Sequence, residues 1–464
     1  MALAGSAAAM WIALVVVGLT WVARTIWNRL SKSESRISDS ANTSCRRKSN
    51  KSRDTGKSRA KDNVLLKHKE PVEATDPFPN KVPEVDVYKK DKPRVNPTRV
   101  PAGNTKKTTG STGTSHALCL NTLKGHNDAI TGIAFGADKS HLRLATSCDD
   151  NTVRLFKLDA DMAAKSFHII RINLENERGL AVSFGQSVSD VLVASTGAVG
   201  ASRLSMYHVP QDQGQAPSRT WQVAEAHGKS AQVSTLAAAA QSGRSPVAVT
   251  CCESDTHLGL WNTGSGARIE MLNTNQLVNH SAVISPNGRF FAAATFTAEV
   301  KIWELQWGKS VSDPVKAVKV MSLQGHKSGV TSVAFSADGT RVVSASTDGF
   351  LIVWNIDVRY SLNEDPKILY KVACASNGKH YSMVTLSPRG VVAACVGPAN
   401  TAMDFLAMEG LSIMDQVSNA HDTKMTCMAW APTPVKAPNG STHELLATAG
   451  TDKKLKLWRS PVAL

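Results

Sequence analysis

The chain has 464 residues, of which 42% are apolar and 20% are charged, a composition that excludes a chain disordered throughout. The formal net charge is +15, and it is unevenly placed. Residues 24–107 carry 22 Lys and Arg against 10 Asp and Glu, whereas residues 108–464 carry 31 against 28. The overall charge is therefore no argument for a basic nucleic-acid-binding face on the C-terminal part.

The first predicted element is an apolar helix over residues 2–23, which contain no charged side chain. A helix of this length spans about 30 Å, the thickness of a bilayer's hydrocarbon core. Arg24, Trp27 and Arg29 flank it, and the excess of basic residues after it predicts that the C-terminal side is cytosolic. The alternatives are a cleaved signal peptide and an organelle transit signal, but no basic residue precedes the apolar run. We expect a single-pass anchor at residues 1–23.

A basic, largely disordered linker is predicted over residues 24–116. Seven prolines lie between positions 71 and 101, and residues 105–116 form a spacer rich in Gly, Ser and Thr. Three interpretations stay open. The segment is a solvated tether, it is attracted to anionic lipid headgroups at about 1 kcal/mol per basic residue, or it contacts RNA.

The remaining residues, 117–464, contain an internal repeat. Its clearest unit spans residues 323–356, with Gly325-His326, two alternating strands, Asp348-Gly349 and a third strand ending in Trp354. Residues 123–158 repeat the pattern with Phe156 in place of the tryptophan. The equivalent positions elsewhere are His126 and Asp150; His227, Asp255 and Trp261; and His421, Asp452 and Trp458.

The number of repeats follows from the spacing of the third strands. They end at Phe156, Trp261, Trp303, Trp354 and Trp458, at intervals of 105, 42, 51 and 104 residues. Each long interval holds a weaker unit, at residues 180–209 and 381–408, which gives seven. Dividing the length by a period of about 43 would favour eight. A strand over residues 117–123 precedes the first unit and is predicted to supply the outer strand of the last one, which closes the ring and leaves no exposed sheet edge.

These residues resemble the WD repeat, which implies an all-β WD40 propeller. With the spacing and the apolar run, the prediction is a seven-bladed WD40 propeller preceded by one transmembrane helix. In that family the histidine, a strand hydroxyl, the aspartate and the tryptophan form a hydrogen-bonded chain within a blade. The hydroxyl of the clearest unit is Ser344 or Ser346. The resemblance implies that the repeated histidines and aspartates are structural, with no catalytic role.

The sequence contains no recognisable catalytic, cofactor or metal motif. Gly-Lys-Ser occurs at residues 56–58, 228–230 and 308–310, but each lacks the earlier glycine of a P-loop. Eight cysteines occur, none in a Cys-x-x-Cys pair, and we interpret them as small buried thiols in a reducing compartment. We expect a protein that is not an enzyme and holds neither cofactor nor metal.

Residues 272–305, together with the anchor and the basic linker, resemble the transducin β-like family of WD-repeat proteins. The resemblance implies an endoplasmic-reticulum membrane protein with a cytosolic propeller that serves as a scaffold. It also implies links to the unfolded-protein response, through a stress-activated kinase and translation-initiation factors as cytosolic partners. The alternative is an RNA- or ribosome-associating protein that uses the linker.

Overall fold

A computed structural model describes most of the C-terminal part of the chain. It covers residues 116–138, 142–158, 169–197, 200–210, 215–229, 231–239, 244, 246–309, 315–374, 379–436 and 441–462. The predicted anchor and the linker up to residue 115 lie outside the described residues. Within the described part, no helix combines the length and the apolar character needed to cross a bilayer.

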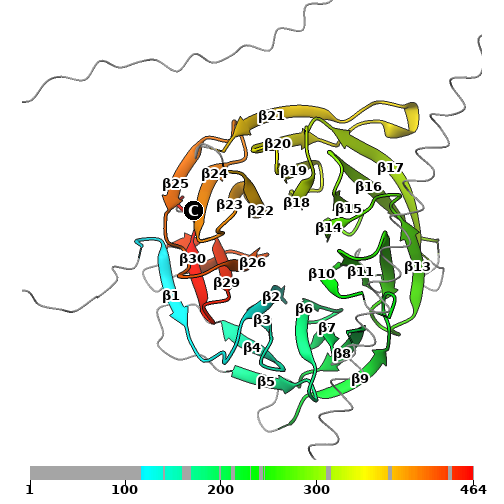
Figure 1. Cartoon of the computed structure of the whole chain (residues 1–464), viewed down its shortest axis with the longest axis vertical. Helices are drawn as coiled ribbons and strands as arrows, with labels where there is room; N and C mark the ends of the chain where they lie inside the picture. Colours follow the sequence, from blue (N-terminus) through cyan, green and yellow to red (C-terminus); the bar gives the residue numbers. More distant parts are fainter. Residues whose placement is uncertain are drawn as a thin grey trace, which may run out of the picture. The chain divides into compact units, whose positions relative to one another are not determined.

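Seven four-stranded antiparallel sheets form a ring, with the first strand of each sheet lining the centre (Figure 1). Blades 1 and 2 consist of β2 (Ile130–Ala137), β3 (Leu142–Cys148), β4 (Thr152–Leu158) and β5 (Ile169–Asn173), then β6 (Arg178–Phe184), β7 (Asp190–Thr196), β8 (Ser202–His208) and β9 (Ser218–Val223). Blades 3 and 4 consist of β10 (Val233–Ala239), β11 (Val247–Cys252), β12 (His257–Asn262) and β13 (Arg268–Asn273), then β14 (Asn279–Ile284), β15 (Phe290–Thr295), β16 (Glu299–Gln306) and β17 (Lys316–Gln324).

Blades 5 and 6 consist of β18 (Val330–Phe335), β19 (Arg341–Ser346), β20 (Phe350–Asn355) and β21 (Lys367–Ala373), then β22 (Tyr381–Leu386), β23 (Val391–Val396), β24 (Ala402–Ala407) and β25 (Ile413–Val417). Blade 7 consists of β26 (Met425–Trp430), β29 (Leu445–Gly450), β30 (Leu455–Arg459) and β1 (Cys119–Leu123). The other elements are the short β27 (Val435–Lys436) and β28 (Thr442–His443) and the 3-10 helix η1 (Tyr360–Leu362). The prediction of seven blades is confirmed.

The ring closes in blade 7, as predicted. Strand β1 pairs antiparallel with β30, with Cys119 opposite Trp458 and Leu123 opposite Leu455. The sheet that completes the circle therefore joins two segments from opposite ends of the repeat region. In Figure 1, β1 lies on the outer rim beside β30.

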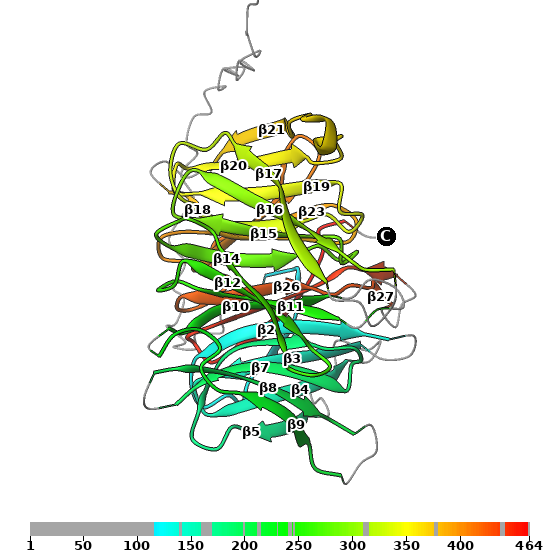
Figure 2. The same ribbon diagram turned by 90° about the vertical axis from the view of Figure 1, so that its right-hand side faces the viewer.

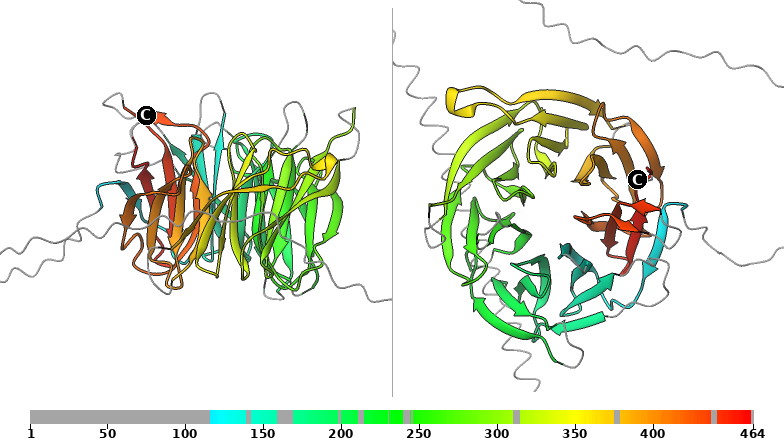
Figure 3. Two further views of the ribbon diagram at one scale, coloured as in Figure 1. Left: turned by 90° about the horizontal axis from the view of Figure 1, so that it is seen from above. Right: turned by 180° about the vertical axis from the view of Figure 1, so that it is seen from behind.

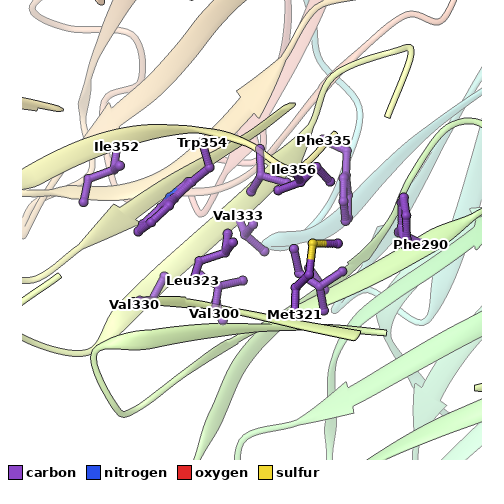
Figure 4. Close-up of a cluster of buried hydrophobic side chains, with 14 residues drawn as sticks. Phe290, Val300, Met321, Leu323, Val330, Val333, Phe335, Ile352, Trp354 and Ile356 are labelled. Carbon is purple, nitrogen blue, oxygen red and sulfur yellow. The ribbon is translucent and has the colours of Figure 1, made fainter. Parts of the chain in front are cut away.

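The second strand of each blade is buried along nearly its whole length. Strands β11, β15, β23 and β29 have every residue buried, and their sequences are short apolar runs such as FFAAAT and VVAACV. Such runs are typical of strands covered on both faces. Neighbouring blades provide the cover: one cluster joins Phe290, Met321 and Leu323 of blade 4 to Val333 and Trp354 of blade 5 (Figure 4).

The strands run between the two faces of the ring, as the side views show (Figures 2 and 3). One face carries the connection that enters each blade and the turn between its second and third strands. His326 and Asp348 lie in these two segments of blade 5, so we call this side the tetrad face. The opposite face carries the turns between first and second strands, where Gly288 and Gly339 adopt positive φ angles of 66° and 73° that favour glycine.

Candidate functional site

Blades 3, 5 and 7 each contain a complete hydrogen-bonded tetrad. In blade 5 the Nδ1 atom of His326 lies 3.1 Å from Asp348, its Nε2 atom lies 2.8 Å from the Ser344 hydroxyl, and the Trp354 indole donates to that hydroxyl at 2.8 Å. Blade 3 repeats this with His227, Asp255, Thr250 and Trp261, and blade 7 with His421, Asp452, Thr448 and Trp458. The hydroxyl of blade 5 is thus Ser344, whereas Ser346 donates to the Ser328 carbonyl.

The tetrad histidine of blade 5 is a neutral structural group. Burial lowers the pKa of His326, and the neighbouring Asp348 only partly offsets the effect. Burial alone would raise the pKa of Asp348, but hydrogen bonds from the Lys327 and Phe350 amides keep it below its ordinary value. An ionised aspartate facing a neutral ring requires the proton on Nδ1, so Nε2 accepts from the hydroxyl and the hydroxyl accepts from tryptophan. Every polar side-chain group of this tetrad then has a hydrogen-bond partner, as a buried network requires.

Blade 1 departs from this pattern. The Nε2 atom of His126 lies 3.1 Å from Thr146 Oγ1, but its buried Nδ1 atom has no hydrogen-bond partner. Asp150 instead pairs with Arg154 at 2.9 Å and accepts from Thr152. The hydrogen bond between His126 and Asp150 that the repeat pattern predicts is therefore not made, because the arginine draws the carboxylate away.

Blades 2, 4 and 6 contain other buried polar contacts. In blade 2, Glu177 accepts from Ser195 at 2.6 Å and from Arg203. In blade 6, the Tyr381 hydroxyl donates to Asp404 at 2.9 Å. Blade 4 keeps the tryptophan position, but there Trp303 stacks on Phe291 with ring centroids 5.2 Å apart.

A ring of bulged residues surrounds the centre near the tetrad face. Each inner strand shifts register against its neighbour near its start, at its second residue in six blades and at its third in β6, which leaves that residue unpaired in the ladder. Three of these residues donate a hydroxyl to a backbone carbonyl of the next blade: Thr131 to Gly179 at 2.8 Å, Thr331 to Tyr381 at 3.1 Å and Thr426 to Ile130 at 2.5 Å. The hydroxyls link adjacent blades at the mouth of the central channel.

The central channel is a cavity of about 660 Å³ lined by residues of the inner strands. Its walls carry many hydroxyl groups, among them those of Thr131, Ser281 and Thr331. Charged side chains are few, and Glu253 and Lys424 lie where the channel meets the tetrad face. A pore whose walls mix hydroxyls with apolar side chains and hold few acids or bases suits recognition of a segment better than acid–base chemistry.

The tetrad face carries two large exposed apolar side chains, both in blade 4. Leu277, in the connection between β13 and β14, is 78% exposed, and Phe296, in the turn between β15 and β16, is 53% exposed. The two segments are joined by a hydrogen bond of 2.9 Å from the Phe296 amide to the Val278 carbonyl. The Phe296 ring lies 6.5 Å from that of His280, which lines the channel. This apolar pair therefore lies at the channel mouth.

Sequence reasoning identified the tetrad histidines, aspartates and tryptophans but missed three kinds of functional residue. It missed the threonine hydroxyls Thr250 and Thr448, although a hydroxyl residue inside an apolar second strand was the available signal. The bulged threonines were missed as well, although two successive polar residues between apolar ones, as in Thr331-Ser332, were the available signal. Leu277 and Phe296 gave only the weak signal of apolar residues inside predicted turns.

Comparison with known proteins agrees with this geometry. The family model for the WD domain, G-beta repeat, matches residues 117–157, 317–355 and 415–459. These segments contain most of blades 1, 5 and 7 together with the closing strand. The chain therefore folds as a seven-bladed β-propeller that contains WD repeats.

Among curated proteins, the chain is similar to human transducin beta-like protein 2, with 29% identity over 55% of both chains. It is also similar to the guanine nucleotide-binding protein subunit beta of rice, with 22% identity over 43% of this chain and 50% of that protein. Small ribosomal subunit protein RACK1z of Arabidopsis thaliana matches with 32% identity over 21% of this chain and 32% of its own. The chain thus spans about half the length of transducin beta-like protein 2.

Proposed function

We propose that the propeller is a protein-binding scaffold that captures an extended segment of a partner across the mouth of the channel. The observation that carries this proposal is the apolar pair of Leu277 and Phe296 on the tetrad face. Exposed large apolar side chains that adjoin a cavity are typical of interaction sites. The fold alone does not choose a partner, so the argument rests on this pair and on the charges around it.

The charges near the mouth define the chemistry of the partner. Lys327, Lys379 and Lys424 are exposed in the connections that enter blades 5, 6 and 7. On the other side of blade 4, the exposed Glu253 lies in a turn of blade 3. The partner segment therefore has an aliphatic or aromatic anchor over blade 4 and acidic residues directed toward blades 5–7.

The test is a double substitution, Leu277→Asp with Phe296→Ser, in the full-length protein. We expect the specific partners recovered by proximity labelling to fall at least tenfold, because burial of two large side chains contributes about 1.5–3 kcal/mol each. Leu362→Ser is the matched control, since Leu362 is 70% exposed in η1 on the opposite face. Equal recovery with the double variant and with the control would refute this surface.

We further propose that residues 2–23 anchor the scaffold in the endoplasmic-reticulum membrane, with the propeller in the cytosol. The support is the uncharged apolar run, its flanking Arg24, Trp27 and Arg29, and the similarity to transducin beta-like protein 2. Partners in stress signalling, a stress-activated kinase and translation-initiation factors follow from the family resemblance. Protease treatment of sealed microsomes tests the topology, because a C-terminal tag on a cytosolic propeller is digested. The three Asn-x-Ser/Thr glycosylation sequons, at Asn42, Asn279 and Asn439, should then carry no glycan. A protected, glycosylated protein would contradict it.

A second candidate function is association with RNA or the ribosome. The 22 basic residues of positions 24–107 support it, as does the similarity of part of the propeller to a small ribosomal subunit protein. Phosphate contacts weaken steeply with salt, so RNA crosslinking should fall strongly between 50 and 200 mM salt. Unchanged crosslinking after deletion of residues 31–107 would exclude the linker as the contact.

A further inference from the structure

Blade 1 brings together three side chains that are ligands for transition metals. One ligand atom from each of His126, Cys148 and Asp150 lies within 4.8 Å of the other two, the one such group among the described residues. Cys148 is fully buried and His126 is only 7% exposed. The Nδ1 atom of His126 is buried without a hydrogen-bond partner, which is costly unless something occupies it.

The missing tryptophan of blade 1 explains the state of this ring. In the complete tetrads the tryptophan donates to the hydroxyl, so the hydroxyl donates to the histidine and the ring proton lies on Nδ1. Blade 1 has Phe156 in that position, so Thr146 is free to accept the proton of His126 Nε2 and to donate to the Arg154 carbonyl at 3.4 Å. The Nδ1 atom then carries a lone pair, which is the form of imidazole that binds a metal.

We propose that blade 1 binds a zinc ion through His126 Nδ1, the thiolate of Cys148 and one carboxylate oxygen of Asp150, with water as the fourth ligand. Nitrogen, sulfur and oxygen donors of this kind are those that Zn²⁺ takes. Tetrahedral zinc places its ligand atoms about 3.5 Å apart, so the three side chains move together by roughly 1 Å. As the zinc–sulfur bond forms, the Cys148 thiol releases one proton to solvent.

The surroundings of the group fit this proposal. The Cys148 sulfur lies at the end of β3, beside the turn that carries Asp150, so the thiol and the carboxylate approach the His126 ring from the same side of the blade. Arg154 opposes a cation, but the carboxylate of Asp150 and the new thiolate of Cys148 add two negative charges to the site. The hydrogen bonds from Arg154 and Thr152 to Asp150 become outer contacts that orient a ligating carboxylate.

The zinc ion would link the ring closure to blade 1. His126 lies in the connection between β1, the closing strand of blade 7, and β2, whereas Cys148 ends β3 and Asp150 lies in the next turn. Because the unfolded chain does not hold the three ligands together, zinc binds the closed ring preferentially and raises its stability.

The test uses the full-length protein, purified with a chelator and then dialysed free of it. Titration with Zn²⁺ by calorimetry should give one tight site, and Co²⁺ in its place should produce a thiolate-to-metal charge-transfer band. Cys148→Ser should abolish the band and weaken zinc binding at least tenfold. This variant should fold, because Ser346 occupies the same register position in blade 5.

Cys252→Ser is the matched control. Cys252 has the same register position in blade 3, but there His227 Nδ1 is already bonded to Asp255 and the thiol lies 3.2 Å from Ser254. The control should keep both the zinc site and the cobalt band. His126→Asn is a second variant that should lose zinc, in case Cys148→Ser folds poorly. No tight zinc site in the wild type, or equal binding by wild type and Cys148→Ser, would overturn the proposal.

Discussion

The hydroxyl of Ser344 bonds both the histidine and the tryptophan of the blade 5 tetrad, so Ser344→Ala tests how much such a network stabilises the ring. Ser344 is fully buried and forms two hydrogen bonds of 2.8 Å, to His326 and from Trp354. The substitution leaves an imidazole nitrogen and an indole N–H buried without a partner. Each orphaned group costs about 1–3 kcal/mol, and we expect the free energy of unfolding to fall by about 2–4 kcal/mol.

Urea denaturation followed by circular dichroism measures this loss, with Thr347→Ala as the control. Thr347 is exposed and lies next to the tetrad turn, so its substitution should change the stability by about 0.5 kcal/mol or less. Combining Ser344→Ala with Trp354→Phe should cost less than the sum of the two single changes, because the phenylalanine has no N–H to orphan. A loss below about 1 kcal/mol, or strict additivity of the two changes, would refute the view that the tetrad acts as one network.

Three other predictions follow from buried groups elsewhere in the ring. Burial lowers the pKa of His126 from 6.5 to about 4. Between these two pH values, with a chelator present, the unfolded chain therefore binds a proton that the folded chain does not. The free energy of unfolding should fall by about 3 kcal/mol as the pH drops from 6.5 to 4. Denaturation of His126→Gln across this range should show a flatter profile, and an unchanged slope would argue against the assignment. Glu444 is 1% exposed and accepts from Ser387 and the Arg389 amide at 2.9 Å, which joins blade 7 to blade 6. Glu444→Ala should cost about 2 kcal/mol and speed hydrogen exchange in residues 387–391, and unaltered exchange there would contradict the link. Thr331→Val removes a hydroxyl bond between blades 5 and 6 at nearly constant volume and should cost about 1 kcal/mol in the same urea assay, whereas a neutral result would assign that bond no net stability.

The architecture could be predicted because several blades repeat the same signals at regular intervals. Apolar second strands and the spacing of the aromatic residues that end the clearer third strands predicted the number of blades, and the strand at residues 117–123 predicted the closure. The pairing within blade 1 could not be predicted in this way. His126 and Asp150 match the pattern in sequence, but Arg154 on the third strand reaches the carboxylate first. Which of the two side chains pairs with Asp150 depends on their positions in space, and the spacing of a motif does not specify these positions.

The proposed interaction surface could not be predicted from the sequence either. Leu277 and Phe296 are separated by 19 positions, and they become neighbours because the connection into blade 4 and the turn between β15 and β16 meet on the tetrad face, where a hydrogen bond joins them. The loss of the tetrad in blade 4, where Ala293 stands at the register position of Ser344, is visible in the sequence but does not reveal what the loops then expose.

The closing sheet also imposes a delay during synthesis of the chain, because β1 and β30 are made at different times. Cys119 and Trp458 face each other across β1 and β30, although the ribosome adds them more than 300 residues apart. At about 5–20 residues per second, β1 waits roughly 20–70 s for the strand that pairs with it. During that interval six blades can form while the seventh has no partner for its first-made strand, and the edges of the open ring are free to pair with other chains. We therefore expect nascent-chain chaperones to protect β1, the strand that closes the finished ring, for longer than any other strand.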